Sequence, residues 1–174
     1  TGAPVVDDLA AVIDRCDVII DYSTVKSSMT VLDLAARHGK AVVCGTTGFS
    51  PADWEMMRQA AVKIPFLYGA NTSRVVNLLY EVLEMVAGKF AGVADIEIIE
   101  MQDRDKKDAP SGTSKELGHA VDKGLGKKFD DIAVFGRAGS GARTPGTIGY
   151  HSVRAGDISS SHTVMFGFKG ERLE

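Results

Sequence analysis

Short apolar runs alternate with amphipathic segments through the first half of the chain, and few folds accommodate such an alternation. Runs rich in β-branched residues at 16–23, 41–49 and 64–71 have the composition of buried strands. Each run is followed by apolar residues at helical spacing, at 26–40, from Ser50-Pro51 onward, and from Ser73 to about Phe90. This regular succession of strand and helix predicts an α/β fold, with a parallel sheet and helices packed on it.

The second half has a different pattern. The run 94–103 alternates strictly at its centre, which predicts a strand whose two faces have different surroundings. Thr113 and Glu116 have the spacing of a capping box, so a helix is predicted to open at Thr113. Further strands are predicted at 130–137, 147–157 and 162–174, in an antiparallel or mixed sheet, with a Gly-rich basic loop at 137–147. We place a domain boundary near 90–94, before this α+β part.

Composition and charge argue against several classes of partner. A net charge of -3 gives no overall attraction for nucleic acid or an anionic membrane, and no apolar stretch is long enough to span a bilayer. Cys16 and Cys44 lie in separate apolar runs, which predicts buried free thiols in the cytoplasm. No two histidines have metal-binding helix spacing, so no metal site is predicted. The chain opens on TGAPVV and stops after GERLE, so we interpret it as an internal piece of a longer protein.

Small and polar residues follow three of the predicted strands, in DYST at 21–24, CGTTGF at 44–49 and GANTS at 69–73. Ligands of open α/β sheets bind at the carboxyl ends of strands, and glycines there let backbone approach a ligand closely. Three ordinary strand-to-helix turns are the alternative. Their coincidence favours a nucleotide or cofactor cleft, although the glycine-rich phosphate fingerprint is not in the chain.

A second candidate site lies in EMQDRDKKDAPSGTS, at 100–114. Ser111-Gly112-Thr113 precedes a predicted helix, whose free N–H groups favour an anion, and Arg104, Lys106 and Lys107 add positive charge. A capped helix beside solvated lysines is the alternative. On these physical grounds alone, that alternative is slightly favoured.

Several motifs give the chain a family resemblance. GTTGF, then Ala70-Asn71-Thr72-Ser73, DAPSGT, PGTIGYHSVRAGDI and HT-MF occur in the order and spacing of the dihydrodipicolinate reductases. The chain resembles this family of 4-hydroxy-tetrahydrodipicolinate reductases, of the diaminopimelate–lysine pathway, over nearly its whole length. The resemblance implies a partial Rossmann-like NAD(P)-binding domain at 1–92, lacking its N-terminal strands. It also implies a mixed-sheet substrate-binding and tetramerisation domain at 93–174, truncated at its C-terminus.

The resemblance further implies a function and a set of site residues. A homotetramer would reduce a cyclic unsaturated dicarboxylate by hydride transfer from NADPH or NADH. Catalysis would involve Lys106, with Gln102 and Asp103 at the family's other catalytic positions. The cofactor would be bound by Tyr22, Ser23, Gly45, Thr46, Thr47, Ala70 and Asn71. The substrate would be bound by Thr47, Asp103, Lys106, Ser111, Gly112 and Thr113. The resemblance therefore reverses the preference at 111–113 in favour of an anion site.

Gln102 and Asp103 depart from the family pattern, which usually has two adjacent histidines there. The first histidine is thought to give a proton to the ring as hydride arrives, and a glutamine side chain cannot titrate. Asp103 adds negative charge near a dicarboxylate unless Arg104 or Lys106 neutralises it. A further departure is Ser161, where the family commonly has Glu.

Several functions remain open from the sequence. The usual substrate could still be reduced, with Lys106, Asp103 or water supplying the proton. A divergent paralogue could instead reduce another cyclic imino acid, or bind a nucleotide without catalysis. Other two-domain dehydrogenases of sugars or semialdehydes share the α/β plan, but that plan gives no reason for DAPSGT. Retention of Lys106 and of the 111–113 segment favours catalysis.

Overall fold

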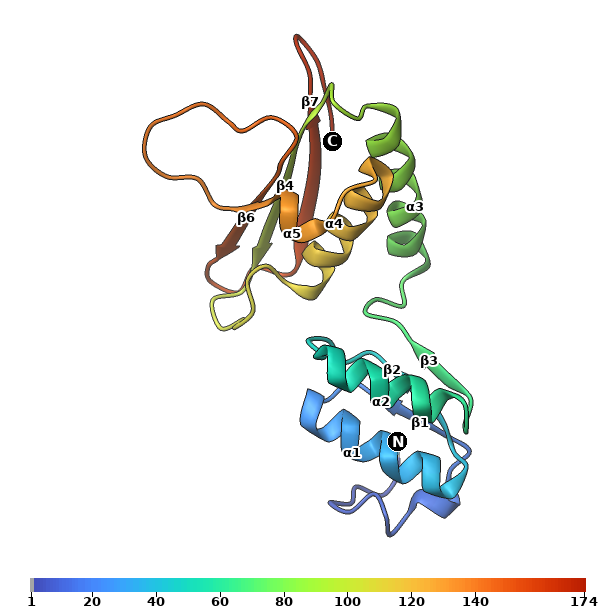
Figure 1. The fold of residues 1–174 in the computed structure, drawn as a ribbon. Helices are drawn as coiled ribbons and strands as arrows, with labels where there is room; N and C mark the ends of the chain where they lie inside the picture. The colour runs from blue at the N-terminus through green and yellow to red at the C-terminus, as the bar shows by residue number, and fades with distance from the viewer. Residues whose placement is uncertain (1) are drawn as a thin grey trace. The chain divides into compact units, whose positions relative to one another are not determined.

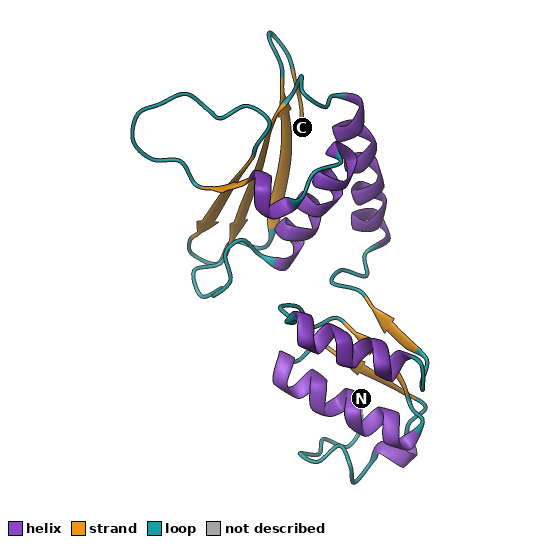
Figure 2. Ribbon diagram, viewed as in Figure 1, coloured by secondary structure: helices purple, strands orange, loops and turns teal. Residues whose placement is uncertain are grey.

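The computed structural model describes residues 2–174, and its contacts divide the chain into two compact units, Thr1–Thr72 and Ser73–Glu174 (Figures 1 and 2). The division therefore falls before helix α3 (Arg74–Lys89), and not near 90–94. Helix α3 belongs to the second unit because it packs along helix α4 (Gly112–Leu125). Its amphipathic pattern indicated a helix correctly, but such a pattern does not say which partner its apolar face meets.

The first unit is a three-stranded parallel sheet with order β1-β2-β3. Helices α1 and α2 pack on this sheet around a core centred on Leu32, Val42 and Met57 (Figure 2). The parallel sheet predicted from the alternating sequence is therefore confirmed. The elements in chain order are η1 (Ile13–Arg15), β1 (Val18–Asp21), α1 (Val25–His38), β2 (Ala41–Cys44), α2 (Pro51–Ala61) and β3 (Phe66–Tyr68).

Local capping fixes the ends of these helices. The Ser50 hydroxyl accepts the Asp53 N–H while the Asp53 carboxylate accepts the Ser50 N–H, so a capping box opens α2 at the predicted helix start. The Thr24 hydroxyl caps α1 by accepting the Ser27 N–H, and Gly39 ends α1 in the left-handed conformation at φ 65°. These caps start each helix directly after a strand-end loop.

The second unit is a five-stranded mixed sheet of order β5-β6-β4-β7-β8. Strand β4 pairs in parallel with β6 and antiparallel with β7, as the prediction of a mixed sheet required. Helices α3 and α4 lie side by side over the sheet (Figure 1). The remaining elements are β4 (Asp95–Gln102), α5 (Phe129–Ile132), β5 (Ala133–Phe135), β6 (Ile148–Arg154), β7 (Ser161–Gly167) and β8 (Arg172–Leu173).

The alternation in β4 separates a buried face from a more open one. Ile96, Ile98, Glu100 and Gln102 are all buried, and the two isoleucines belong to the core formed with α3 and α4. The same periodicity therefore carries two polar side chains, Glu100 and Gln102, onto the buried face at the end of the strand. They lie beside the start of α4.

Two predicted element boundaries are wrong. Helix α4 begins after Ser111, and the Ser111 hydroxyl accepts the Ser114 N–H, so the capping box predicted at Thr113 does not form. The segment 130–137 is not a strand throughout, because its first residues form the short helix α5. Acidic side chains at Asp130 and Asp131 favour the first turn of a helix through its dipole, which explains this helical turn.

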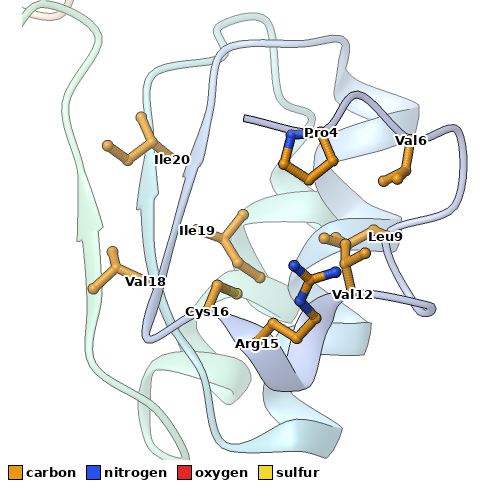
Figure 3. A pocket seen from close by; sticks show the side chains of 9 residues that line it. All are labelled: Pro4, Val6, Leu9, Val12, Arg15, Cys16, Val18, Ile19 and Ile20. Carbon is orange, nitrogen blue, oxygen red and sulfur yellow. The ribbon is translucent and has the colours of Figure 1, made fainter. Parts of the chain in front are cut away.

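An apolar pocket of about 390 Å³ lies beside β1 in the first unit (Figure 3). Leu9, Arg15 and Ile20 are among the side chains that line it, and the N-terminal segment forms one wall. None of the residues predicted to bind cofactor contributes to this lining. The pocket is therefore separate from the predicted cofactor cleft.

Among residues 2–174, no helix combines the length and apolar character needed to cross a membrane. Within the same residues, no group of three or more His, Cys, Asp and Glu side chains is arranged to hold a metal ion.

Candidate functional site

The three strand-end loops of the first unit do meet at one edge of the sheet. Asp21 pairs with Cys44 and Cys44 pairs with Tyr68, so the three strands end level with one another. Hydrogen bonds extend this alignment into the loops: the Gly45 N–H donates to the Asp21 carbonyl at 2.8 Å, and the Gly69 N–H donates to the Cys44 carbonyl at 3.0 Å. Residues predicted to bind a cofactor from three separate segments are thereby brought together.

A buried hydroxyl network holds two of these loops. The Thr46 hydroxyl accepts the Ser23 N–H at 3.0 Å and the Ser28 hydroxyl at 2.8 Å, and Thr46 is 6% exposed. The Ser23 hydroxyl donates to the Asp21 carboxylate at 2.5 Å. The Thr46 side chain therefore ties the β2 loop to the β1 loop, whereas Thr47, Tyr22 and Ser23 remain exposed at the edge.

Tyr22 lies across the GTTGF turn. A side chain at Gly45 would overlap the Tyr22 ring, so glycine is required for this close approach. The Tyr22 hydroxyl lies 3.4 Å from the Thr72 hydroxyl, and Tyr22 is 58% exposed. The aromatic ring thus forms an exposed surface above the β2 loop, next to partly exposed Ala70 and Asn71.

In the second unit, Ser111 is turned into the protein at the N-terminus of α4. Ser111 is 3% exposed, its hydroxyl caps the helix, and its N–H donates to the Glu100 carboxylate at 3.1 and 3.2 Å. Gly112 and Thr113, the first residues of the helix, are partly exposed. Of the predicted SGT segment, these two residues present the positive end of the helix to solvent.

Glu100 is the centre of the buried network beneath this helix end. It also accepts hydrogen bonds from the Ser114 hydroxyl at 2.7 Å, Gln102 Nε2 at 3.1 Å and Arg154 Nη2 at 2.6 Å. Burial by itself would raise the pKa of Glu100, but hydrogen bonds from Ser111, Ser114, Arg154 and Ser152 outweigh burial and hold that pKa far below its usual range. Glu100 is therefore a buried carboxylate that stays ionised.

His162 reaches the same network from β7. Its Nε2 lies 3.2 Å from the Ser111 hydroxyl and 3.5 Å from Glu100 Oε2. Burial lowers the pKa of His162, with Arg154 and Lys106 adding to this effect and Glu100 opposing it. The sequence analysis missed Glu100, Arg154 and His162, and only the cross-strand register of β4 with β6 and β7 brings them together.

Lys106 forms an ion pair on the loop that leads to α4. Its Nζ lies 2.7 Å from Asp108 Oδ1, and its side chain is 28% exposed. Burial by itself would raise the pKa of Asp108, but hydrogen bonds from Lys106 and from the Gly112 N–H help to hold it below its usual range. The carboxylate of Asp108 is thus ionised, and it contacts both Lys106 and the start of α4.

Gln102 and Asp103 have different surroundings. The Gln102 side chain is 7% exposed and donates to Glu100, so it points into the buried network. Asp103 is partly exposed, and its carboxylate accepts the Asp105 N–H at 2.9 Å. Gln102 supports Glu100, while Asp103 stabilises the turn that carries Lys106.

Two family models match the chain in these two units. The model described as dihydrodipicolinate reductase, N-terminus, matches residues 1–72, and the one described as dihydrodipicolinate reductase, C-terminus, matches residues 75–174. The chain belongs to the dihydrodipicolinate reductase family. This confirms the resemblance drawn from GTTGF, DAPSGT and RAGDI.

Two members of this family resemble the chain, one in sequence and one in fold. The 4-hydroxy-tetrahydrodipicolinate reductase of Hahella chejuensis (strain KCTC 2396) is 44% identical over 174 residues, which cover 99% of this chain and 65% of that relative. The chain therefore spans just under two thirds of the length of this curated relative. A dipicolinate-bound dihydrodipicolinate reductase from Paenisporosarcina sp. TG-14 superposes with a TM-score of 0.68 at 23% identity, over 96% of this chain and 64% of that one. This likeness supports the Rossmann-like fold and the second, mixed-sheet domain.

Proposed function

We propose that the protein to which this chain belongs reduces 4-hydroxy-tetrahydrodipicolinate to tetrahydrodipicolinate with NADPH or NADH. The observation that carries the proposal is the helix end at Gly112 and Thr113, with Lys106 beside it, in a member of the reductase family. A helix N-terminus next to a lysine suits a carboxylate of the substrate. The relative from Paenisporosarcina, named as dipicolinate-bound, supports a planar cyclic dicarboxylate as the ligand class.

The first unit has a donor set that fits a dinucleotide at its strand ends. Exposed hydroxyls of Ser23 and Thr47, the Tyr22 ring and the close-lying Gly45 backbone offer hydrogen bonds and a flat apolar surface. Ala70 and Asn71 complete this edge, and Thr46 holds the loops from within. A bound nicotinamide would supply the hydride. The residues of this chain would orient it and leave one ring face open.

Lys106 is the group we propose for charge balance and proton supply in the second unit. The overall reduction consumes one hydride and one proton and releases one water. Gln102 has no titratable proton and is committed to Glu100, so it cannot supply that proton. Lys106 is partly exposed, cationic and next to the helix end, and therefore suits both roles. Ser111 would act indirectly, by fixing the backbone of Gly112 and Thr113.

An oligomeric state and a cellular location are also proposed for the protein. A homotetramer assembled through the second unit is proposed from family membership, and exposed apolar side chains such as Met101 and Val153 on the sheet suit a protein partner. A cytoplasmic location is consistent with Cys16 and Cys44, which are free thiols.

The test is NAD(P)H oxidation by the intact protein with freshly prepared 4-hydroxy-tetrahydrodipicolinate. We expect Lys106→Ala to lower kcat by about 10²-fold or more, in line with loss of general acid catalysis. Lys107→Ala is the matched control, because Lys107 is an exposed neighbour outside the Asp108 ion pair. Equal small effects of both changes would contradict the role of Lys106. Tight cofactor binding without oxidation would support a non-catalytic paralogue instead.

A further inference from the structure

Asp108 lies where the proposed substrate carboxylate would need to bind. Its carboxylate is 2.7 Å from Lys106 Nζ, and it lies close enough to the Gly112 N–H for that group to help lower the pKa of Asp108. Lys106 and Gly112 are two of the groups assigned to the substrate above. Both predicted anion-binding groups thus hold a carboxylate of the chain itself.

The loop geometry favours this arrangement. The Asp108 carbonyl accepts Arg154 Nη2 at 2.6 Å, and the same nitrogen donates to Glu100. Arg154 therefore anchors the backbone of Asp108 to the buried network, while the Asp108 side chain stays 48% exposed. A fixed backbone with an exposed carboxylate means that the side chain can turn away from Lys106 without moving the loop.

We propose that Asp108 is an internal counter-anion that competes with the substrate carboxylate for Lys106 and the N-terminus of α4. The proposal rests on the function proposed above and adds a determinant of affinity to that site. In the free protein, the Asp108 carboxylate occupies Lys106. When a carboxylate binds, Asp108 gives up Lys106 and the Gly112 N–H, and this exchange weakens the apparent affinity for the ligand.

The alternative is that Asp108 only positions Lys106 for the substrate. The two roles predict opposite changes in ligand affinity when the charge of Asp108 is removed. Removing the charge of a competitor strengthens ligand binding, since Lys106 and Gly112 become free and a like charge is lost. Removing a positioning carboxylate weakens ligand binding, because Lys106 loses its fixed orientation. Asp108→Asn separates the two cases, as it keeps the size and shape of the side chain.

The experiment is calorimetric titration of the intact protein with dipicolinate at fixed pH and ionic strength. We expect Asp108→Asn to lower the dissociation constant by about two- to fivefold, the upper part of the range for an exposed charge contact. Asp105→Asn is the control, because Asp105 is exposed on the same loop and forms none of the ion pairs among the described residues. It makes the same charge change and should alter the constant by less than about twofold.

A double variant tests whether Asp108 changes the affinity for dipicolinate through Lys106. In a Lys106→Ala background, Asp108→Asn should produce a smaller gain, because Lys106 is no longer there to be freed. Weaker binding by Asp108→Asn, or equal gains from Asp108→Asn and Asp105→Asn, would overturn the proposal. Binding by Asp108→Asn alone, with none by the parent, would support it strongly. Absence of dipicolinate binding in every variant would overturn the proposed function, and this inference with it.

Discussion

Replacement of Glu100 by glutamine should be among the most destabilising conservative changes in the second unit. The Glu100 carboxylate is 1% exposed and accepts from Ser111, Ser114, Gln102 and Arg154 at distances between 2.6 and 3.2 Å. A glutamine amide keeps one acceptor oxygen, but its NH₂ group would face donors, such as the Ser111 N–H or the Ser114 hydroxyl, where the carboxylate offers an acceptor. Breaking a buried ion pair from one side costs about 3–5 kcal/mol, and we expect Glu100→Gln to fall in that range.

The assay is urea unfolding followed by far-UV circular dichroism, at one protein concentration for all variants. The matched control is Glu84→Gln, which breaks the exposed ion pair between Glu84 and Lys123 in the same unit. Exposed pairs contribute below about 1 kcal/mol, so the control should shift the unfolding midpoint little. Hydrogen exchange of the β4 amides would locate the loss in the second unit. A Glu100→Gln variant no less stable than Glu84→Gln would refute the view that Glu100 anchors this network.

Two further outcomes follow from the same structure. The folded-state pKa of Glu100 lies below its unfolded value of 4.5. The ionised carboxylate therefore contributes fully to the free energy of unfolding above that pH, and this contribution is lost as the pH falls towards the folded pKa. In urea titrations, the difference in unfolding free energy between the parent and Glu100→Gln should narrow below about pH 4.5. Gly124→Ala should lower the free energy of unfolding by about 1–3 kcal/mol in the same urea assay, although alanine favours helices, because its methyl group would overlap the Glu84 carbonyl oxygen where α3 and α4 meet. Gly88→Ala should cost less, because its methyl group would lie 3.2 Å from the Gly124 carbonyl oxygen, a tight contact that needs a smaller shift.

Much of the first unit could be predicted because its signals are local. The helix start at Ser50-Pro51 and each of the three strands are indicated by residues within a few positions of one another, and the alternation of strand and helix indicates that the strands are parallel. The meeting of the strand-end loops also followed, since parallel strands end at one edge. The division before α3 could not be predicted, because it depends on the packing of that helix along α4.

The buried network of the second unit could not be predicted for the same reason. Ser111 contacts His162 and Glu100 pairs with Arg154 across more than fifty residues of chain, through a strand register that no local pattern specifies. The strand predicted at 94–103 includes Glu100 and Gln102, but the sequence did not indicate that the period of β4 places both polar side chains on the buried face. The position of Ser111 as the true N-cap likewise depends on Glu100 accepting its N–H.

The most direct test of the proposed function is the rate of NAD(P)H oxidation by the intact protein with 4-hydroxy-tetrahydrodipicolinate, measured beside Gln102→His. The proposal predicts clear turnover by the parent, since Lys106 and the Gly112–Thr113 helix end are in place. Replacement of the family's general-acid histidine by Gln102 would slow the reaction by about 10²–10⁴-fold at most, without abolishing it. No turnover by either form, with cofactor bound, would contradict the assignment of this site to the reductase reaction.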